Sequence, residues 1–235
     1  MDTAAVRTDH MSSEPVRAPQ RQRLLGLDVA RALALFGIMA NHLLSGPTWA
    51  AHTLVHLMSD YHAVGFAVLI GAGAQLEGQR KSGREQAISV TMRAGFLCLL
   101  GFTLGMWVTS VAVILVTLGF LTALAYIGAK LPAKTLAVAL VLVGLLGPVG
   151  TIANRLYEYL PANLNPNFYD LAHPRQIAAL FISDPYPFLA WLFYALCGIA
   201  LMRWAGARAR PLGVGISMVA GGFAVVLLTS CIPVP

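Results

Sequence analysis

Apolar runs of about 20 residues recur along most of the chain, separated by short polar or proline-containing stretches. An α-helix of about that length is needed to cross the hydrocarbon core of a bilayer. The pattern therefore predicts an all-α, polytopic membrane helix bundle with about seven transmembrane helices. The expected spans are residues 24–44, 48–76 as one long or kinked unit, 88–108, 111–128, 131–152, 187–202 and 212–232.

Three stretches interrupt this pattern. Residues 1–22 are polar, rich in Pro, Ser, Ala and charge, and lack the apolar core of a signal peptide, so we expect a disordered cytoplasmic tail. Residues 77–84 are expected to form a charged loop. Residues 153–186 hold several Asn, Pro and aromatic residues without a spanning run, which predicts an extracytoplasmic loop. Residues 23–235 would then form a single transmembrane domain.

Composition and charge support this interpretation. The chain is 57% apolar and 11% charged, whereas about a quarter of the residues of a soluble domain are charged. The net charge of +6 could indicate a nucleic-acid partner, but the basic residues lie in short loops and form no stripe with aromatics. We therefore expect the lipid bilayer, and no nucleic acid, as partner. The three cysteines lie in apolar runs without CxxC spacing, which is typical of buried thiols: Cys98, Cys197 and Cys231.

The distribution of Lys and Arg predicts the orientation, because cytoplasmic loops carry the excess. A cytoplasmic N-terminus and an outside C-terminus leave only Arg155 and Arg175 outside. The residues assigned to the cytoplasm are Arg7, Arg17, Arg21, Arg23, Arg80, Lys81, Arg84, Lys130, Lys134, Arg203, Arg208 and Arg210. The prediction is a multi-pass protein of the cell membrane.

The first span, from Arg23 to His42, carries the most informative polar residues. At about 100° per residue, Asp28, Arg31 and His42 lie on one side of the helix, and Arg31 and His42 are about 16 Å apart along it. Charged groups inside a bilayer usually face a bundle interior or a water-filled cavity and mark a site. Asp28 and Arg31 form either a structural ion pair at the membrane edge or a pair in which Arg31 is available to bind an anionic substrate.

Arg93 is a second intramembrane cation at a similar predicted depth. Guanidinium groups bind phosphate and carboxylate through two parallel hydrogen bonds. Together with Arg80, Lys81 and Arg84 in the adjacent loop, Arg93 would suit a phosphorylated donor that enters from the cytoplasm. The alternative is that the loop cations only determine topology.

Histidines follow on the opposite side of the predicted membrane. His42 is the strongest candidate for a general base, because imidazole accepts and returns a proton near neutral pH. His52, His56 and Asp60 share a helix face at i, i+4 and i+8 and could bind zinc. Since no second histidine pair follows, we expect no metal, and a structural role, proton transfer or substrate contact remain open for them.

Several stretches resemble one family of membrane enzymes. LDVARALALFGIMANH (27–42) resembles the first-helix signature of the heparan-alpha-glucosaminide N-acetyltransferase family and its bacterial relatives. The spacing between Arg31 and His42 is also similar to the broader pattern of membrane acyltransferases. Later stretches fit in order: FAVLIGAGAQL (66–76), VAVILVTLGFLTALAY (111–126) and DPYPFLAWLFYALCGIALMRW (184–204).

This resemblance implies transfer of an acyl group, with acetyl-CoA or another acyl-CoA on the cytoplasmic side and a sugar or other hydroxyl or amine acceptor on the far side. His42 matches a polar site residue of the family, and His52 is the nearest match to its catalytic histidine. Asn41, Asp60 and His62 are the expected acceptor contacts.

The resemblance also leaves alternatives open. Asp60, Tyr61 and His62 stand where family members often carry a Gly-Arg pair, and the family is usually longer. A non-catalytic membrane subunit or binding protein of a larger complex is therefore an alternative, with further helices from another subunit or a second copy. A small transporter that uses the polar side of the first span, with Asp28, Arg31 and His42, as a proton or anion path is a third alternative.

Overall fold

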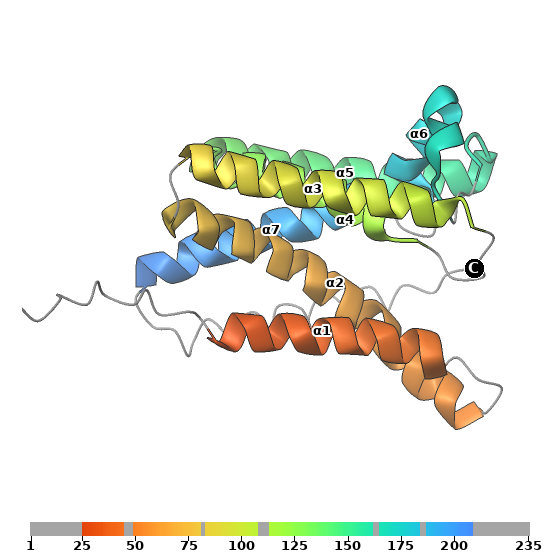
Figure 1. Cartoon of the computed structure of the whole chain (residues 1–235), viewed down its shortest axis with the longest axis horizontal. Coiled ribbons are helices and arrows are strands. Elements are labelled where there is room, and N and C mark those ends of the chain that lie inside the picture. Colours follow the sequence, from red (N-terminus) through yellow and green to blue (C-terminus); the bar gives the residue numbers. More distant parts are fainter. Residues whose placement is uncertain are drawn as a thin grey trace, which may run out of the picture.

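The computed structural model describes residues 25–44, 49–80, 83–107, 113–161, 165–183 and 187–208. Within these ranges the protein is entirely helical, with seven α-helices, one 3-10 helix and no strand (Figure 1). The α-helices are α1 (Leu25–Leu44), α2 (Trp49–Arg80), α3 (Gly83–Gly105), α4 (Leu115–Gly128), α5 (Ala133–Tyr157), α6 (Pro174–Ile182) and α7 (Phe188–Arg208). The 3-10 helix, η1, covers Phe168–Ala172.

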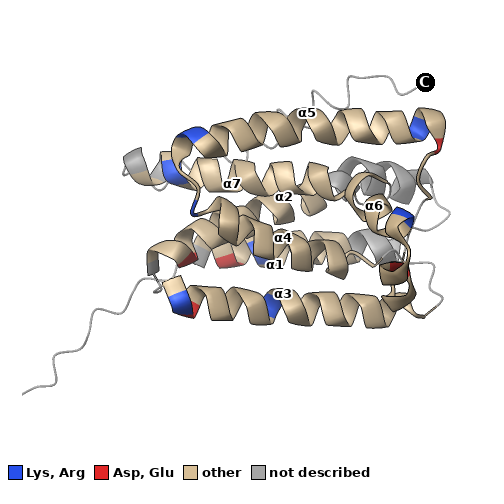
Figure 2. Ribbon diagram, turned by 90° about the horizontal axis from the view of Figure 1, so that it is seen from above, with Lys and Arg blue, Asp and Glu red and all other residues tan. Residues whose placement is uncertain are grey.

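The long helices run antiparallel in a bundle. α1, α3 and α5 begin, and α2, α4 and α7 end, at the same end of the molecule (Figures 1 and 2). We call it the basic end because the described cations near these helix termini are Arg84, Lys130, Lys134 and Arg203. Arg155 and Arg175 lie at the opposite end, where α5 stops and α6 begins.

Two of the described helices, α3 and α5, are long and apolar enough to cross a membrane by length and composition. Only 22% of the apolar window of α3 and 11% of that of α5 are buried in the bundle. The core helix of a soluble protein is instead mostly buried. α4 and most of α7 form shorter apolar helices.

The core of the bundle lies between α2, α4 and α7. Its buried residues are Ala67, Leu118, Leu121, Ala125, Phe188, Trp191 and Ala195. Two glycines bring α2 and α7 into backbone contact: a Cβ on Gly71 would collide with the carbonyl oxygen of Ala195, and one on Gly198 with that of Val68. Small residues permit such a close approach of two helices.

α3 packs mainly against α4 and hardly touches α2, although only two residues separate it from α2. A Cβ on Gly101 would lie 2.7 Å from the backbone nitrogen of Val116, which shows how closely α3 and α4 approach. α2 and α3 are instead bridged by long polar side chains, one of which is Gln86, whose Nε2 donates to the carbonyl of Ala74 at 3.2 Å.

Arg203 of α7 ties three elements together at the basic end. Its Nη1 donates to the carbonyl of Leu131 at 2.7 Å, and its Nη2 to the carbonyls of Ala129 at 2.9 Å and Gly128 at 3.4 Å. Its Nε donates to Oε1 of Gln75 on α2 at 3.0 Å. The last carbonyls of a helix have no partner within the helix, so Arg203 stabilises the end of α4 and fixes it to α2.

The helix boundaries correct two expectations. The charged loop expected at 77–84 is wrong, because α2 continues to Arg80 and α3 begins at Gly83. The stretch 153–186 is more helical than expected, since α5 extends to Tyr157 and η1 and α6 follow. The expected tail at 1–22 and the expected span at 212–232 lie outside the described residues.

Candidate functional site

The predicted pair on α1 is present. Nη1 of Arg31 lies 3.5 Å from Oδ1 of Asp28, and its Nη2 donates to the carbonyl of Leu69 on α2 at 3.3 Å. The guanidinium lies over Gly73, where a Cβ would collide with Nη2. Arg31 therefore reaches inward across α2, and 37% of its side chain remains exposed.

Arg93 on α3 has a partner that the sequence reasoning did not identify. Its Nη1 and Nη2 lie 3.1 Å and 3.3 Å from the two carboxylate oxygens of Glu77 on α2, and Ser89 donates to the same carboxylate at 3.3 Å. The Glu77 side chain is 16% exposed and that of Arg93 is 57% exposed. A cation within an expected membrane span needs a counter-charge, and this need was the signal that could have identified Glu77.

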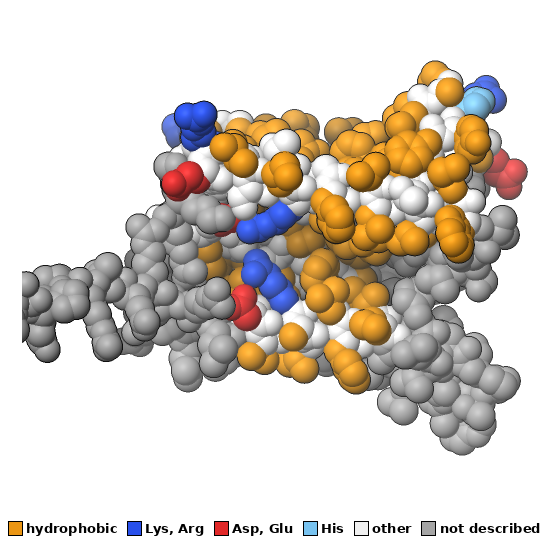
Figure 3. Space-filling view, viewed as in Figure 1, with side chains coloured by type: hydrophobic (Ala, Val, Ile, Leu, Met, Phe, Trp, Pro, Cys, Tyr) orange, Lys and Arg blue, Asp and Glu red, His pale blue; other side chains and the backbone are white. Residues whose placement is uncertain are grey.

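The two arginines lie over neighbouring turns of one face of α2. Gly73 under Arg31 and Glu77 beside Arg93 are four residues apart, so they share a face one turn, or about 6 Å, apart. Figure 3 shows basic side chains from α1 and α3 approaching each other across a hollow. We call this hollow the α1–α3 recess; α2 forms its floor, and Asp28, Arg31, Glu77 and Arg93 lie at its basic end.

The predicted histidine group is only partly described. His62 packs against α1 at Gly37, where a Cβ would collide with the imidazole ring. Positions 41, 42, 52, 56 and 60 fall within α1 and α2, toward the end opposite the basic end. The side chains of Asn41, His42, His52, His56 and Asp60 lie outside the described residues.

The remaining predicted donor contacts lie near the α2–α3 junction. Arg84 is exposed in the first turn of α3, and Arg80 is the last residue of α2. The side chain of Arg80 and the whole of Lys81 lie outside the described residues. In the described ranges no group of three or more His, Cys, Asp or Glu side chains could hold a metal ion.

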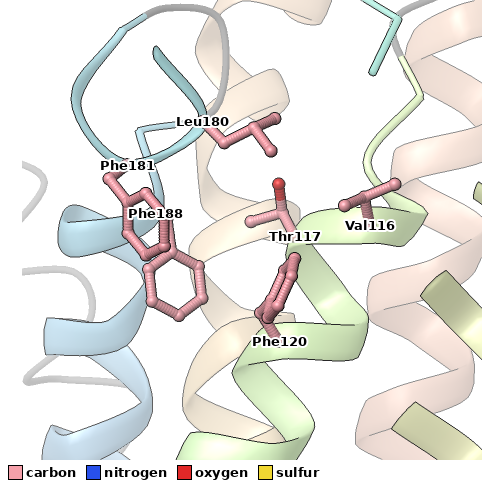
Figure 4. Close-up of a pocket in the computed structure, with 6 residues that line it drawn as sticks. All are labelled: Val116, Thr117, Phe120, Leu180, Phe181 and Phe188. Carbon is pink, nitrogen blue, oxygen red and sulfur yellow. The ribbon is translucent and has the colours of Figure 1, made fainter. Parts of the chain in front are cut away.

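Two further hollows lie toward the end of the bundle opposite the basic end. The first lies between α4, α6 and α7, and the threonine hydroxyl in it is surrounded by apolar side chains (Figure 4). As it stands in the structure, this hollow has no room for a water molecule. Its lining residues are Val116, Thr117, Phe120, Leu180, Phe181 and Phe188.

The second hollow is open, with a volume of about 310 Å³, and is lined by Gly105, Met106, Trp107, Asn165, Asn167 and Tyr169. Its two amides have structural roles. Oδ1 of Asn165 accepts from the backbone nitrogen of Val113 at 3.2 Å, and Asn167 forms a capping box with Asp170 at the start of η1. Capping of this kind stabilises the helix start.

The α1–α3 recess is therefore the part of the described structure that gathers the predicted site residues. It brings Arg31 and Arg93 together on α2 and adds Glu77 and Ser89. The chain has no significant match among models of known protein families, curated proteins or solved structures.

Proposed function

We propose that the protein is a multi-pass integral protein of the cell membrane that transfers an acyl group from a cytoplasmic CoA-type donor to a sugar or other hydroxyl or amine acceptor. The single observation that carries this proposal is the placement of two partly exposed guanidinium groups, Arg31 and Arg93, over neighbouring turns of one face of α2.

Support for the membrane location comes from the outer surface of α5. Apolar side chains that are each more than half exposed run along the whole helix: Val138, Val141, Leu142, Leu145, Leu146, Val149, Ile152 and Leu156. Soluble monomers rarely expose an apolar patch larger than a few hundred Å². A surrounding bilayer would remove these side chains from water.

The helix directions support the proposed orientation. Arg84, Lys130, Lys134 and Arg203 lie at one end of an antiparallel bundle, with Arg155 and Arg175 at the other. Because cytoplasmic segments carry the excess of Lys and Arg, the basic end would face the cytoplasm. The bundle would then cross the membrane with about seven helices, its N-terminus inside and its C-terminus outside.

The donor set of the recess fits a phosphorylated ligand. Guanidinium groups match phosphate oxygens in geometry and charge, and the side chains of Arg31 and Arg93 remain 37% and 57% exposed. Arg31 and Arg93 would hold the phosphates of acyl-CoA. The role of Asp28 and Glu77 would be to orient the two guanidinium groups.

The proposed base lies at a different depth. His42 is eleven residues after Arg31 on α1, or about 16 Å along the helix, and His52 lies in the first part of α2. One of these imidazoles would accept the proton of the acceptor hydroxyl or amine. The resemblance of residues 27–42 to the N-acetyltransferase family supports this assignment.

The test is a transfer assay on the purified full chain in lipid, with labelled acetyl-CoA as donor and glucosamine as acceptor. We expect His42→Ala or His52→Ala to lower turnover by about a hundredfold or more, and Arg93→Gln to raise KM for acetyl-CoA by about tenfold. His173→Ala, on the exposed N-cap of α6, and Lys134→Gln are the controls. Full turnover in both His42→Ala and His52→Ala would refute the proposed base.

A second candidate is a non-catalytic membrane subunit or binding protein that retains the same helices. The observation that favours it is that each arginine already has a carboxylate partner, Asp28 for Arg31 and Glu77 for Arg93. Such pairs neutralise charges that are costly inside a bilayer. Copurification of a stoichiometric partner, with no heat of acetyl-CoA binding in calorimetry, would favour this candidate over the enzyme.

A further inference from the structure

The α1–α3 recess exists because α3 does not pack on its neighbour in sequence. α3 packs on α4, while α1 packs on α2, and α2 and α3 are in close contact at few positions. At the basic end the space between α2 and α3 is bridged by polar contacts, Arg93 and Ser89 to Glu77 and Gln86 to Ala74. Beyond Arg93 the described structure has no such bridge.

The described side chains that follow the arginines along the walls of the recess are apolar, and the side chain of His42, further along the same side of α1, lies outside the described residues. On α3, Phe96, Leu100 and Leu104 follow Arg93 at helical spacing on nearly the same face, and their side chains are 64%, 36% and 41% exposed. On α1, Leu35 follows Arg31 by one turn and is 46% exposed. Figure 3 shows hydrophobic side chains continuing along both helices from the basic side chains.

The length of the apolar wall matches one leaflet of a bilayer. Arg93 and Leu104 are eleven residues apart, or about 16 Å along α3. The hydrocarbon core of a bilayer is about 30 Å thick, so each leaflet contributes about half of that. The recess therefore has one end that carries two guanidinium groups, each paired with a carboxylate, and an apolar wall as long as one lipid tail.

We propose that the α1–α3 recess binds one anionic phospholipid of the surrounding bilayer, with its phosphate between Arg31 and Arg93 and one tail along Phe96, Leu100 and Leu104. This inference rests on the membrane location in the proposed function, but not on acyl transfer. Because the proposed function assigns the same two guanidinium groups to the acyl-CoA phosphates, a bound lipid and acyl-CoA would compete for the recess. The lipid enters sideways between α1 and α3 and needs no aqueous path. Its phosphate accepts hydrogen bonds from both guanidinium groups and joins the carboxylates of Asp28 and Glu77 as their counter-charge.

The test measures which lipid the protein retains. The full chain is placed in nanodiscs of equal amounts of phosphatidylglycerol and phosphatidylcholine and extracted in mild detergent, and the retained lipid is identified by native mass spectrometry. We expect one retained lipid per chain, with phosphatidylglycerol enriched about fivefold. This is less than two unpaired cations would give, because the carboxylates of Asp28 and Glu77 offset part of the charge of Arg31 and Arg93. Equal retention of both lipids by the unaltered chain would overturn the proposal.

Two matched pairs of variants locate the site. Leu100→Trp fills the recess, whereas Leu145→Trp makes the same change on the exposed face of α5, where Leu145 is 62% exposed. Arg93→Gln removes a cation from the recess, and Lys134→Gln removes one at the start of α5. We expect Leu100→Trp and Arg93→Gln to abolish the enrichment and both controls to keep it. If either recess variant retains the enrichment, or Leu145→Trp loses it, the proposal is wrong.

The measurement also distinguishes a lipid site from a site for a free anion, and it tests the lipid site separately from the proposed enzyme. Inorganic phosphate in excess should leave the retained lipid in place; its displacement would identify a site for the free anion and overturn the proposal. If Arg93→Gln does not fold, the comparison of Leu100→Trp with Leu145→Trp still tests whether the lipid binds in the recess. Lipid retention without acetyl transfer would refute the proposed enzyme and leave the lipid site, and transfer without retention would do the reverse.

Discussion

The backbone contact between α2 and α7 leads to a prediction that compares two identical substitutions on one helix. Gly71→Ala would place a Cβ against the carbonyl group of Ala195, with the carbonyl carbon at 2.7 Å and the Cα at 3.0 Å. These are backbone atoms, which cannot rotate away as a side chain does. Gly65→Ala, less than two turns earlier on α2, meets no atom within 4 Å in the described structure.

The magnitude follows from two opposing terms. Overpacking costs about 1–3 kcal/mol, and a backbone collision belongs at the upper end of that range. Replacing Gly by Ala within a helix contributes about 1 kcal/mol in the other direction. We expect Gly71→Ala to lower the free energy of unfolding by about 2 kcal/mol and Gly65→Ala to raise it by up to about 1 kcal/mol. The difference, about 3 kcal/mol, is more than a hundredfold in the unfolding equilibrium.

A thiol on α7 provides the assay. Cys197 is a free, partly buried cysteine next to Gly198, which makes the reciprocal contact with Val68. With Cys98 and Cys231 replaced by Ala, the rate at which a thiol-reactive dye labels Cys197 during heating reports separation of α7 from α2. Gly71→Ala should label at a lower temperature than the parent, and Gly65→Ala at the same or a higher one. Equal shifts in the two variants would refute the proposed backbone contact.

Three further predictions follow from the polar contacts and the helix directions. Arg203→Gln removes donors from three carbonyls at the end of α4 and should lower the free energy of unfolding by about 2–3 kcal/mol. In the same thermal assay, the control Lys134→Gln should stay within about 0.5 kcal/mol of the parent. Equal effects of the two substitutions would contradict the capping role of Arg203. Glu77→Gln weakens the two-oxygen contact with Arg93 and should cost about 1–2 kcal/mol, whereas no change in the labelling temperature would show that the pair is not stabilising. A cysteine in place of Arg155 should react with a membrane-impermeant maleimide on intact cells and one in place of Arg84 should not, and the reverse pattern would invert the orientation.

Much of the helical layout could be predicted from apolar run length. α1 ends at Leu44 as expected, and α3, α5 and α7 overlap their expected spans. The prediction for the junction between α2 and α3 was wrong because the charges of residues 77–84 indicated a solvated loop. In the structure Glu77 is neutralised by Arg93, so the helix continues through it, and this partner lies sixteen residues away in the sequence.

Short helices and tertiary contacts were harder to predict from the sequence. α6 has only nine residues, too few for a criterion based on spans, although the capping pattern of Asn167 and Asp170 was a readable signal for η1. Arg203 was assigned to topology alone, because its bonds to residues 128–131 depend on α7 lying beside the end of α4. Where the helices cross likewise determines which glycines are needed for close helix packing: a Cβ would collide with backbone atoms at Gly71 but meets no described atom within 4 Å at Gly65.

The attachment of α1 has a consequence for dynamics. Within the described part of the chain, α1 packs substantially on α2 alone, through contacts such as Arg31 with Leu69 and Gly37 with His62. Elements with few neighbours open at lower free energy than the core that carries them. Amide hydrogens of α1 should therefore exchange with solvent deuterium before those of α2. Movement of α1 relative to α2 would then change the width of the recess. A ligand bound by both Arg31 and Arg93 would slow the exchange of the amide hydrogens of α1.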